Sequence, residues 1–217
     1  MKSLFVVAAL CSAFSAFAAG NIVVDGSFED VVQPSGTYGY YAGIPGWAVS
    51  AGQGDSIEVR TDLVGTAQDG VNYVELDSTH NSGMTQSVAT IAGQTYTLSF
   101  YYSNRAQDPN YNSPFPGGVV PVSTQGLSVD VGAGAITVSA LPVNTTPNNQ
   151  WMLYTTTFTA TGSTLLTFEA LGESDSWGTS LDNVSVTAAV PEPAPLAMLG
   201  AGLLVFGGLA RRRNRQS

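Results

Sequence analysis

The sequence is poor in cysteine, histidine and charged residues. Its 217 residues include one Cys, one His and only 11% charged residues, against roughly 25% in an ordinary soluble domain. With 44% hydrophobic residues, the chain lacks the high charge and low hydrophobicity of disordered proteins. Scarce Glu and Lys also argue against a long helical bundle. The abundant Thr, Ser, Val, Tyr and Gly predict a β-rich fold with many turns.

Basic residues are almost absent from the middle of the chain. Between Gly20 and Ala189 the only basic residues are Arg60 and Arg105, against fifteen Asp and Glu, so this body has a formal net charge of −13. The other five basic residues lie at the two ends. An acidic body repels phosphate backbones, whose recognition requires positive charge. We therefore expect no nucleic acid among its partners.

The residues that many enzymes use for nucleophilic or metal chemistry are missing. His80 is the only histidine, so a histidine-based zinc site would have one ligand, and the sequence has no Gly-x-Ser-x-Gly elbow. Acidic residues are by default solvated surface groups. We predict a protein that is not an enzyme. The alternative is a glycoside hydrolase, with carboxylates from Glu75 and Asp77, or from Glu169, Glu173 and Asp175.

The first 18 residues have the pattern of a signal peptide. Lys2 is followed by the apolar run 4–10, and Ala16-Phe17-Ala18 has the small-x-small pattern that signal peptidase cleaves. We place the cleavage after Ala18; the alternative is a buried N-terminal helix. Cleavage removes Cys11, the only cysteine. The mature protein then has no disulfide, so its stability depends on core burial and on any metal that it binds.

The C-terminal segment 190–217 combines three features. Pro191-Glu192-Pro193 precedes an uncharged, mostly apolar run at 194–210, which is followed by Arg211, Arg212, Arg213 and Arg215. Seventeen helical residues extend roughly 25 Å, the short end of a transmembrane helix, and the arginines would stay on the cytoplasmic side. The two prolines favour an extended chain that an enzyme can reach.

This tail resembles the PEP-CTERM sorting signal. The resemblance implies a Gram-negative bacterium in which an exosortase, an integral-membrane cysteine protease, recognises the segment and cleaves near Pro191-Glu192-Pro193. It also implies an association with exopolysaccharide production. The expected route is export, a transient stay in the inner membrane through the helix at 194–210, and then the cell surface or extracellular matrix. The alternative is a permanent single-pass anchor.

Residues 20–189 show the period-2 alternation of β-strands. Between 95 and 102, the apolar side chains of Tyr96, Leu98, Phe100 and Tyr102 share one face. About eight to ten short strands predict a single all-β domain, a two-sheet jelly-roll sandwich. Between strands, Val131-Gly132-Ala133-Gly134 and Thr161-Gly162-Ser163 predict hairpin turns. The segment 104–125 contains four prolines and predicts a long loop.

Several motifs of this body resemble the galactose-binding-like jelly-roll superfamily, which includes carbohydrate-binding modules. They are Asn21 to Glu29, Gly46-Trp47, Asp69 to Leu76, Ala92 to Phe100 and Leu181 to Val186. In similar modules, the Glu of the first motif and the Asp of the last strand bind a structural calcium ion. The resemblance therefore implies Ca²⁺ at Glu29 and Asp182, whose carboxylates suit a hard cation. The alternative is that both residues only cap turns.

The resemblance also implies sugar or polymer binding, which requires flat aromatic rings beside polar groups. Trp177 lies in a polar stretch, whereas Trp47, after Gly46, is expected in the core. We predict a polysaccharide-binding protein. One alternative is a structural matrix protein with no ligand pocket, which would show no exposed aromatic platform. The candidate ligand-binding residues are Trp177, Tyr111, Phe115, Arg105 and Tyr41.

Overall fold

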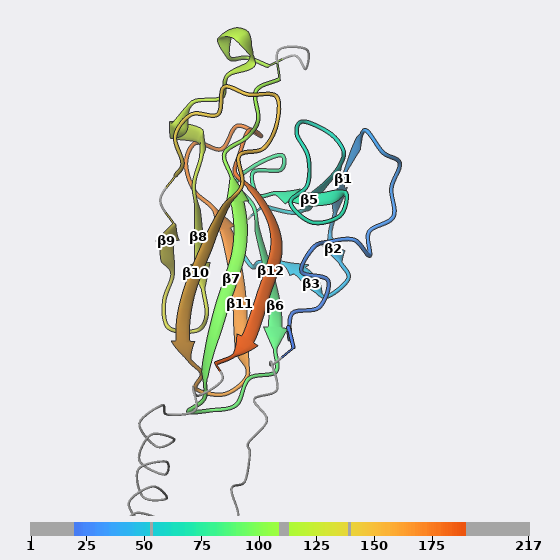
Figure 1. Cartoon of the computed structure of the whole chain (residues 1–217). Helices are drawn as coiled ribbons and strands as arrows, with labels where there is room; N and C mark the ends of the chain where they lie inside the picture. Colours follow the sequence, from blue (N-terminus) through green and yellow to red (C-terminus); the bar gives the residue numbers. More distant parts are fainter. Residues whose placement is uncertain (1–19, 53, 109–112, 139, 190–217) are drawn as a thin grey trace, which may run out of the picture. The chain divides into compact units, whose positions relative to one another are not determined.

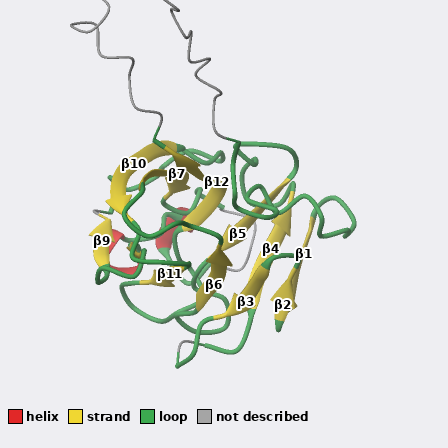
Figure 2. Cartoon of the chain, turned by 90° about the horizontal axis from the view of Figure 1, so that it is seen from below, coloured by secondary structure: helices red, strands yellow, loops and turns green. Residues whose placement is uncertain are grey.

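A computed structural model describes residues 20–52, 54–108, 113–138 and 140–189 of the chain. Its described residues form two β-sheets with two short 3₁₀ turns and no α-helix (Figure 2). The prediction of an all-β two-sheet sandwich is therefore confirmed. The predicted signal peptide and C-terminal helix lie outside the described residues. Within the described ranges, no helix is long and apolar enough to cross a membrane.

The first sheet contains six antiparallel strands in the order β1-β4-β5-β12-β7-β10. The strands of this sheet are β1 (Thr37–Tyr41), β4 (Ile57–Thr61), β5 (Asn72–Glu75), β7 (Thr95–Ser103), β10 (Met152–Thr159) and β12 (Ser180–Ala188). The second sheet has the order β2-β3-β6-β11-β8-β9. Its strands are β2 (Gly43–Ile44), β3 (Trp47–Val49), β6 (Gly83–Val88), β8 (Leu127–Asp130), β9 (Ile136–Val138) and β11 (Thr164–Ala170).

The core lies between the two sheets and is built by side-chain alternation. Along β7, Leu98 and Phe100 are fully buried between the layers. The Phe100 ring meets the ring of Phe168 on β11 edge to face, with centroids 5.0 Å apart, and so joins the two sheets. Trp47 contacts the same Phe168 ring from β3 at 6.0 Å and is 3% exposed, as expected for a core residue. Such aromatic pairs add to the burial of apolar area.

One of the two expected hairpins is present. Residues 131–134 connect β8 to β9, which pair antiparallel in the second sheet, so that prediction is confirmed. Residues 161–163 connect β10 to β11, which belong to different sheets. The hairpin predicted there is wrong, because the turn carries the chain from one layer to the other. A short Gly-containing turn serves both purposes, and local sequence does not distinguish them.

The first described residues pair with the last strand, near one end of the molecule (Figure 1). The Asn21 side chain accepts a hydrogen bond from Val186 N at 2.9 Å and donates one to Val184 O at 3.1 Å. Gly26 O accepts a third from Val184 N at 2.8 Å. A Cβ at Gly26 would lie 2.1 Å from Val184 O, so this approach requires glycine. These contacts close the sandwich without a disulfide.

We expect the stability of the body to depend on β7. Replacing Leu98, fully buried, by Ala should lower the free energy of unfolding by about 2–5 kcal/mol, because it leaves a cavity. Leu165→Ala is the matched control, since Leu165 is 56% exposed on β11 and should change the value by less than about 0.5 kcal/mol. Urea unfolding measures both variants, and equal effects would contradict the layer assignment.

Candidate functional site

Trp177 lies between two residues of the long loop predicted at 104–125. The guanidinium carbon of Arg105 lies 4.1 Å from the centroid of the Trp177 ring. The ring of Phe115 meets the same indole edge to face, with centroids 5.8 Å apart and an interplanar angle of 85°. Three candidate residues, separated by up to 72 positions in the sequence, therefore form one cluster.

Backbone hydrogen bonds fix the segment that carries Trp177. The carboxylate of Asp77, which follows β5 and is fully buried, accepts hydrogen bonds from the amides of Asp175, Ser176 and Trp177 at 2.8, 2.8 and 3.3 Å. The carbonyl oxygen of Trp177 accepts hydrogen bonds from the side chains of Thr124 and Gln125. Since a buried carboxylate needs such donors, Asp77 positions the loop.

A buried ionic network lies beside this cluster. Nη1 of Arg105 donates to both carboxylate oxygens of Glu75, at 2.6 Å in the case of Oε2. Nε of Arg60 lies 2.8 Å from Glu75 Oε2, and its Nη2 lies 2.8 Å from Glu58 Oε1. All four side chains are at most 5% exposed. The only two cations of the acidic body are therefore both used here.

Strand register places these charges in rows across the first sheet. Glu58 and Arg60 alternate with core residues on β4 and therefore share its outer face. Glu58 stands opposite Tyr40 on β1 and Glu75 on β5. Arg60 stands opposite Tyr38 on β1. Like charges directly opposite in a ladder are destabilising, so the two arginines are needed to hold Glu58 and Glu75 on one face.

A small cavity of about 150 Å³ opens above these rows. Tyr38 and Tyr40 form its rim, with 41% and 46% of their surface exposed and their rings edge to face at 5.5 Å. The complete set of lining residues is Tyr38, Tyr40, Glu58, Arg60, Arg105, Ser176 and Trp177. We call this cavity the Tyr–Trp pocket. It combines aromatic rings with buried charged donors and acceptors.

Burial changes the acidity of the groups that line this pocket. It raises the pKa of Glu58 to about 7, because the two arginines offset desolvation only in part and Glu75 adds repulsion. Burial also raises the pKa of Tyr40 to about 12, so this hydroxyl stays neutral and can donate. Near neutral pH, Glu58 is therefore present in both its protonated and its ionised form.

The structure places the other candidate ligand residues differently. Tyr41 follows Tyr40 on β1 and so points to the opposite face, where it packs against the core and donates a hydrogen bond to Gln33 Oε1 at 2.8 Å. Its position does not bring it to the Tyr–Trp pocket. Tyr111 lies outside the described residues. The binding roles of Trp177, Phe115 and Arg105 stay predictions.

Sequence reasoning missed Glu58 and Arg60 as site residues, and it named Glu75 only as a carboxylate of the hydrolase alternative. The signal that was available is the alternation Ile57-Glu58-Val59-Arg60, which places Glu58 and Arg60 on one face of a strand. The outer face of such a strand would ordinarily be solvated. Arg60 also had a compositional signal, since it is one of two basic residues in a body with fifteen acidic ones. A lone cation in such a sequence needs an acidic partner when it is buried.

The proposed calcium ligands contact the same stretch of chain. Glu29 Oε1 accepts hydrogen bonds from the amides of Val71 and Asn72 at 2.9 and 2.7 Å. Asp182 Oδ2 accepts two from the amides of Gln68 and Asp69 at 2.7 and 3.0 Å. The two ends of the body thus meet at residues 68–72. Among the described residues there is no group of three or more His, Cys, Asp or Glu that could hold a metal.

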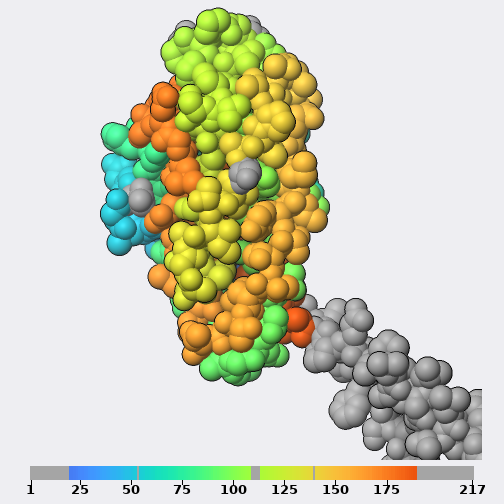
Figure 3. Space-filling model, turned by 90° about the vertical axis from the view of Figure 1, so that its left-hand side faces the viewer, coloured from blue at the N-terminus to red at the C-terminus, as the bar shows by residue number. Residues whose placement is uncertain are grey.

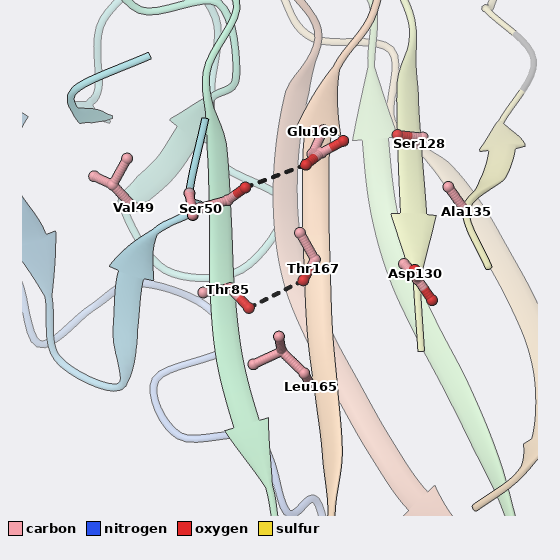
Figure 4. Close-up of a pocket in the computed structure, with 10 residues that line it drawn as sticks. Val49, Ser50, Thr85, Ser128, Asp130, Ala135, Leu165, Thr167 and Glu169 are labelled. Atoms are coloured by element: carbon pink, nitrogen blue, oxygen red, sulfur yellow. Dashed lines mark hydrogen bonds between the residues drawn. The ribbon is translucent and has the colours of Figure 1, made fainter. Parts of the chain in front are cut away.

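A larger groove of about 400 Å³ crosses the outer face of the second sheet (Figure 4). Two hydrogen bonds lie in it, from Ser50 Oγ to Glu169 Oε1 at 3.2 Å and between the hydroxyls of Thr85 and Thr167 at 3.0 Å. Its lining includes no aromatic ring. Sugar rings stack on aromatic faces, so the smaller Tyr–Trp pocket is the better candidate.

A third cavity, of about 310 Å³, adjoins the segment 141–146. Figure 3 shows residues of the loop after β7 gathered at one end of the molecule, beside the segment that leads to β10. Asn104 donates hydrogen bonds to Leu141 O and Pro142 O at 2.6 and 3.2 Å. This cavity is also lined without an aromatic side chain, and its contacts serve to hold the loop.

Comparison with known proteins identifies the C-terminal segment. Residues 189–214 match the family model of the PEP-CTERM protein-sorting motif. The chain carries a PEP-CTERM sorting motif. This confirms the resemblance inferred from Pro191, Glu192, Pro193 and the arginines Arg211, Arg212 and Arg213. No curated protein matches the chain.

The body is similar in fold to several solved structures. A cyclase from Fischerella sp. TAU is 22% identical, with a TM-score of 0.55, over 81% of this chain and all of that one. TmCBM61, solved in complex with beta-1,4-galactotriose, is 14% identical, with a TM-score of 0.45, over 78% and 99% of the two chains. The CBM22-1 xylan-binding domain from Paenibacillus barcinonensis is 15% identical, with a TM-score of 0.41, over 82% and 99%. At such identities the likeness concerns the fold alone.

We expect the stability of the protein to fall as the pH rises from about 4.5 to 7. Glu58 has a raised pKa, so the folded chain retains a proton that the unfolded chain releases in this range. The raised pKa values of Asp175, to about 6, and Asp182, to about 7, act in the same direction. The stabilising contribution is complete below the ordinary pKa of these groups and is lost above pH 7.

Glu58→Gln should reduce this pH dependence, because it removes one of the carboxyl groups whose pKa is raised in the folded protein. Thermal melts between pH 4.5 and 8 measure the slope for each variant. Glu169→Gln, on the second sheet, is the matched control and should retain the wild-type slope. A slope unchanged in Glu58→Gln would contradict the assignment of Glu58.

Proposed function

We propose that this protein is an exported, non-catalytic cell-surface protein that binds polysaccharide through the Tyr–Trp pocket. One observation carries the proposal: Trp177, packed on Arg105 and Phe115, lines a cavity whose rim is formed by two half-exposed tyrosines. Aromatic rings give a sugar its stacking surface, and buried charged groups give its hydroxyls donors and acceptors.

The sorting motif supports the cellular part of the proposal. The match at residues 189–214 implies export and processing by an exosortase, after removal of the signal peptide by signal peptidase. We propose that the helix at 194–210 holds the protein in the inner membrane only until this step. Its destination is then the cell surface or an exopolysaccharide matrix.

The non-catalytic role is supported by how the carboxylates are used. Glu75 is bound by two arginines and by the amide of Gly178 at 2.9 Å, and Asp77 is bound by three amides. Both oxygens of Glu75 are engaged, whereas Asp77 accepts all three amides on Oδ2 and its Oδ1 is buried without a hydrogen-bond partner among the described residues. Fixed, buried carboxylates of this kind are poorly placed to act as nucleophile or base in the glycoside hydrolase alternative. One observation favours that alternative, since Glu58 has the raised pKa of a general acid. The binding experiment below separates the two.

We expect Trp177→Ala to weaken polysaccharide binding on the order of tenfold or more, as for a buried aromatic anchor. Affinity electrophoresis of the purified protein against a panel of neutral and acidic glycans measures the effect. Trp151→Ala is the matched control, because Trp151 lies outside the pocket and donates its indole N–H to Thr66 O.

Two results would count against this proposal. If no glycan retards the wild-type protein, polysaccharide binding is wrong and a structural matrix role takes its place. If the same incubations release new reducing ends, and Glu58→Gln abolishes the release, the protein is a hydrolase. Retardation without cleavage, lost in Trp177→Ala and kept in Trp151→Ala, supports the binding role.

We also propose that Glu29 and Asp182 hold a structural calcium ion. Supporting this, both carboxylates lie at residues 68–72, and the two ends of the body have no disulfide to join them. Against it, both oxygens of Asp182 already accept amide hydrogens, from Gln68, Asp69 and Asn183. A calcium ion takes six to eight oxygens, so backbone carbonyls or water would have to complete the shell.

Calcium should raise the melting temperature by a few degrees, because an ion that binds only the folded state stabilises it. The rise should be larger at pH 8 than at pH 5, since burial raises the pKa of Asp182 to about 7 and protonation competes with the metal. Melts with calcium and with chelator measure it, using Asp182→Asn as the test variant and Glu169→Gln as its control. Identical melts in calcium and chelator would exclude the ion.

A further inference from the structure

The Tyr–Trp pocket is the one part of the acidic body where positive charge collects. Arg60 and Arg105 are the only basic residues between Gly20 and Ala189, and both line the pocket. They reach it from separate parts of the chain, Arg60 from β4 and Arg105 from the loop that follows β7. A ligand that enters this pocket therefore meets two guanidinium groups.

The hydrogen-bonding capacity of these two guanidinium groups is only partly used. A guanidinium has five N–H donors. Arg105 uses Nη1 on Glu75 and on Ser176 O, and Arg60 uses Nε and Nη2 on Glu75 and Glu58. Within the described ranges of the chain, Arg60 Nη1 and Arg105 Nε are buried without a partner. Unpaired buried donors are unfavourable, so an acceptor that reached these two atoms would relieve that cost.

The carboxylates of the network do not neutralise both arginines at neutral pH. Glu75 is bound on both oxygens. Glu58 faces Arg60, Glu75 and Arg105, and its pKa lies near 7 because of burial. Of the groups at the rim, Tyr40 is neutral. The raised pKa of Glu58 reduces the negative charge that opposes the two arginines, and protonation of Glu58 at lower pH reduces it further.

We infer that the Tyr–Trp pocket binds the carboxylate of an acidic sugar, a uronic acid residue of a polysaccharide. The carboxylate would accept hydrogen bonds from Arg60 Nη1 and Arg105 Nε, while the sugar ring contacts the tyrosines of the rim. A cavity of about 150 Å³ is below the range of roughly 300–1,000 Å³ for drug-sized ligands, which limits it to one sugar unit. This inference rests on the proposed polysaccharide binding and names its ligand class.

Matched pairs of monosaccharides test the ligand class on the purified protein. Methyl glucuronide is compared with methyl glucoside, and methyl galacturonide with methyl galactoside, by saturation-transfer NMR and calorimetry at pH 5 and pH 8. The acid member of each pair should bind on the order of tenfold more tightly at pH 5. Its advantage should shrink at pH 8, where Glu58 is ionised and repels the carboxylate. The sugar carboxylate itself is ionised at both pH values.

Glu58→Gln supplies the decisive variant, because it removes the competing negative charge and keeps the size of the side chain. It should bind the acid sugars as tightly at pH 8 as at pH 5. Glu169→Gln, on the second sheet, is the matched control and should keep the wild-type pH dependence.

The outcomes separate this inference from the proposed function. Preference for the acid sugars that Glu58→Gln makes independent of pH supports it. If neutral sugars bind as tightly as acid ones, or Glu58→Gln leaves the pH profile unchanged, the ligand class is wrong. Polysaccharide binding then still stands wherever Trp177→Ala abolishes retardation in the gel. If no sugar binds in either assay, both proposals are wrong.

Discussion

The carboxylate of Glu75 is the interaction on which the candidate site depends. It lies at the end of β5 and binds Arg60 from β4, Arg105 from the long loop and the amide of Gly178. Four parts of the chain thus meet at one buried charge. Removing one partner of such a network leaves the others buried and uncompensated, which is strongly destabilising. The arrangement of Trp177 over Arg105 follows from this contact, because both residues are fixed relative to Glu75.

A body without disulfides and with few cations has limited means to order its loops. The long loop is held by side-chain hydrogen bonds, such as the one that Gln125 accepts from Arg105 N and the one that it donates to Trp177 O. The ends of the body are joined by Asn21 and by the amides around Glu29 and Asp182. Each neutral bond contributes only about 0.5–1.5 kcal/mol. The two arginines are therefore concentrated where burial makes each ion pair strongest, and the remaining surface stays acidic.

Sequence alone predicted the two layers and, of the residues that line the Tyr–Trp pocket, named Trp177 and Arg105 as candidates. The alternation of apolar and polar residues along β7 predicted which face of this strand is buried, because the side of a strand that covers a core must be apolar. Trp177 was identifiable as an aromatic residue in a polar stretch. The pairing of Glu58 with Arg60 and Glu75 could not be identified from the sequence. It depends on strand register and on the loops that cover the outer face of the sheet. Tyr41 shows the same limit, since a one-residue shift along β1 separates it from Tyr40 and turns it into the core.

The end of β5 shows how two acidic residues that are close in the sequence hold different parts of one loop. Glu75 and Asp77 lie two positions apart, the spacing that suggested a carboxylate pair, yet each binds a different part of the segment 175–178. Asp77 accepts three amides of that segment, and Gly178 passes so close to Asp77 that a Cβ would lie 2.5 Å from the Asp77 Cβ. Ser176, with φ of 70°, is held in the left-handed region by these contacts. The two carboxylates are fixed acceptors that shape a loop, and the shape of that loop sets the position of Trp177.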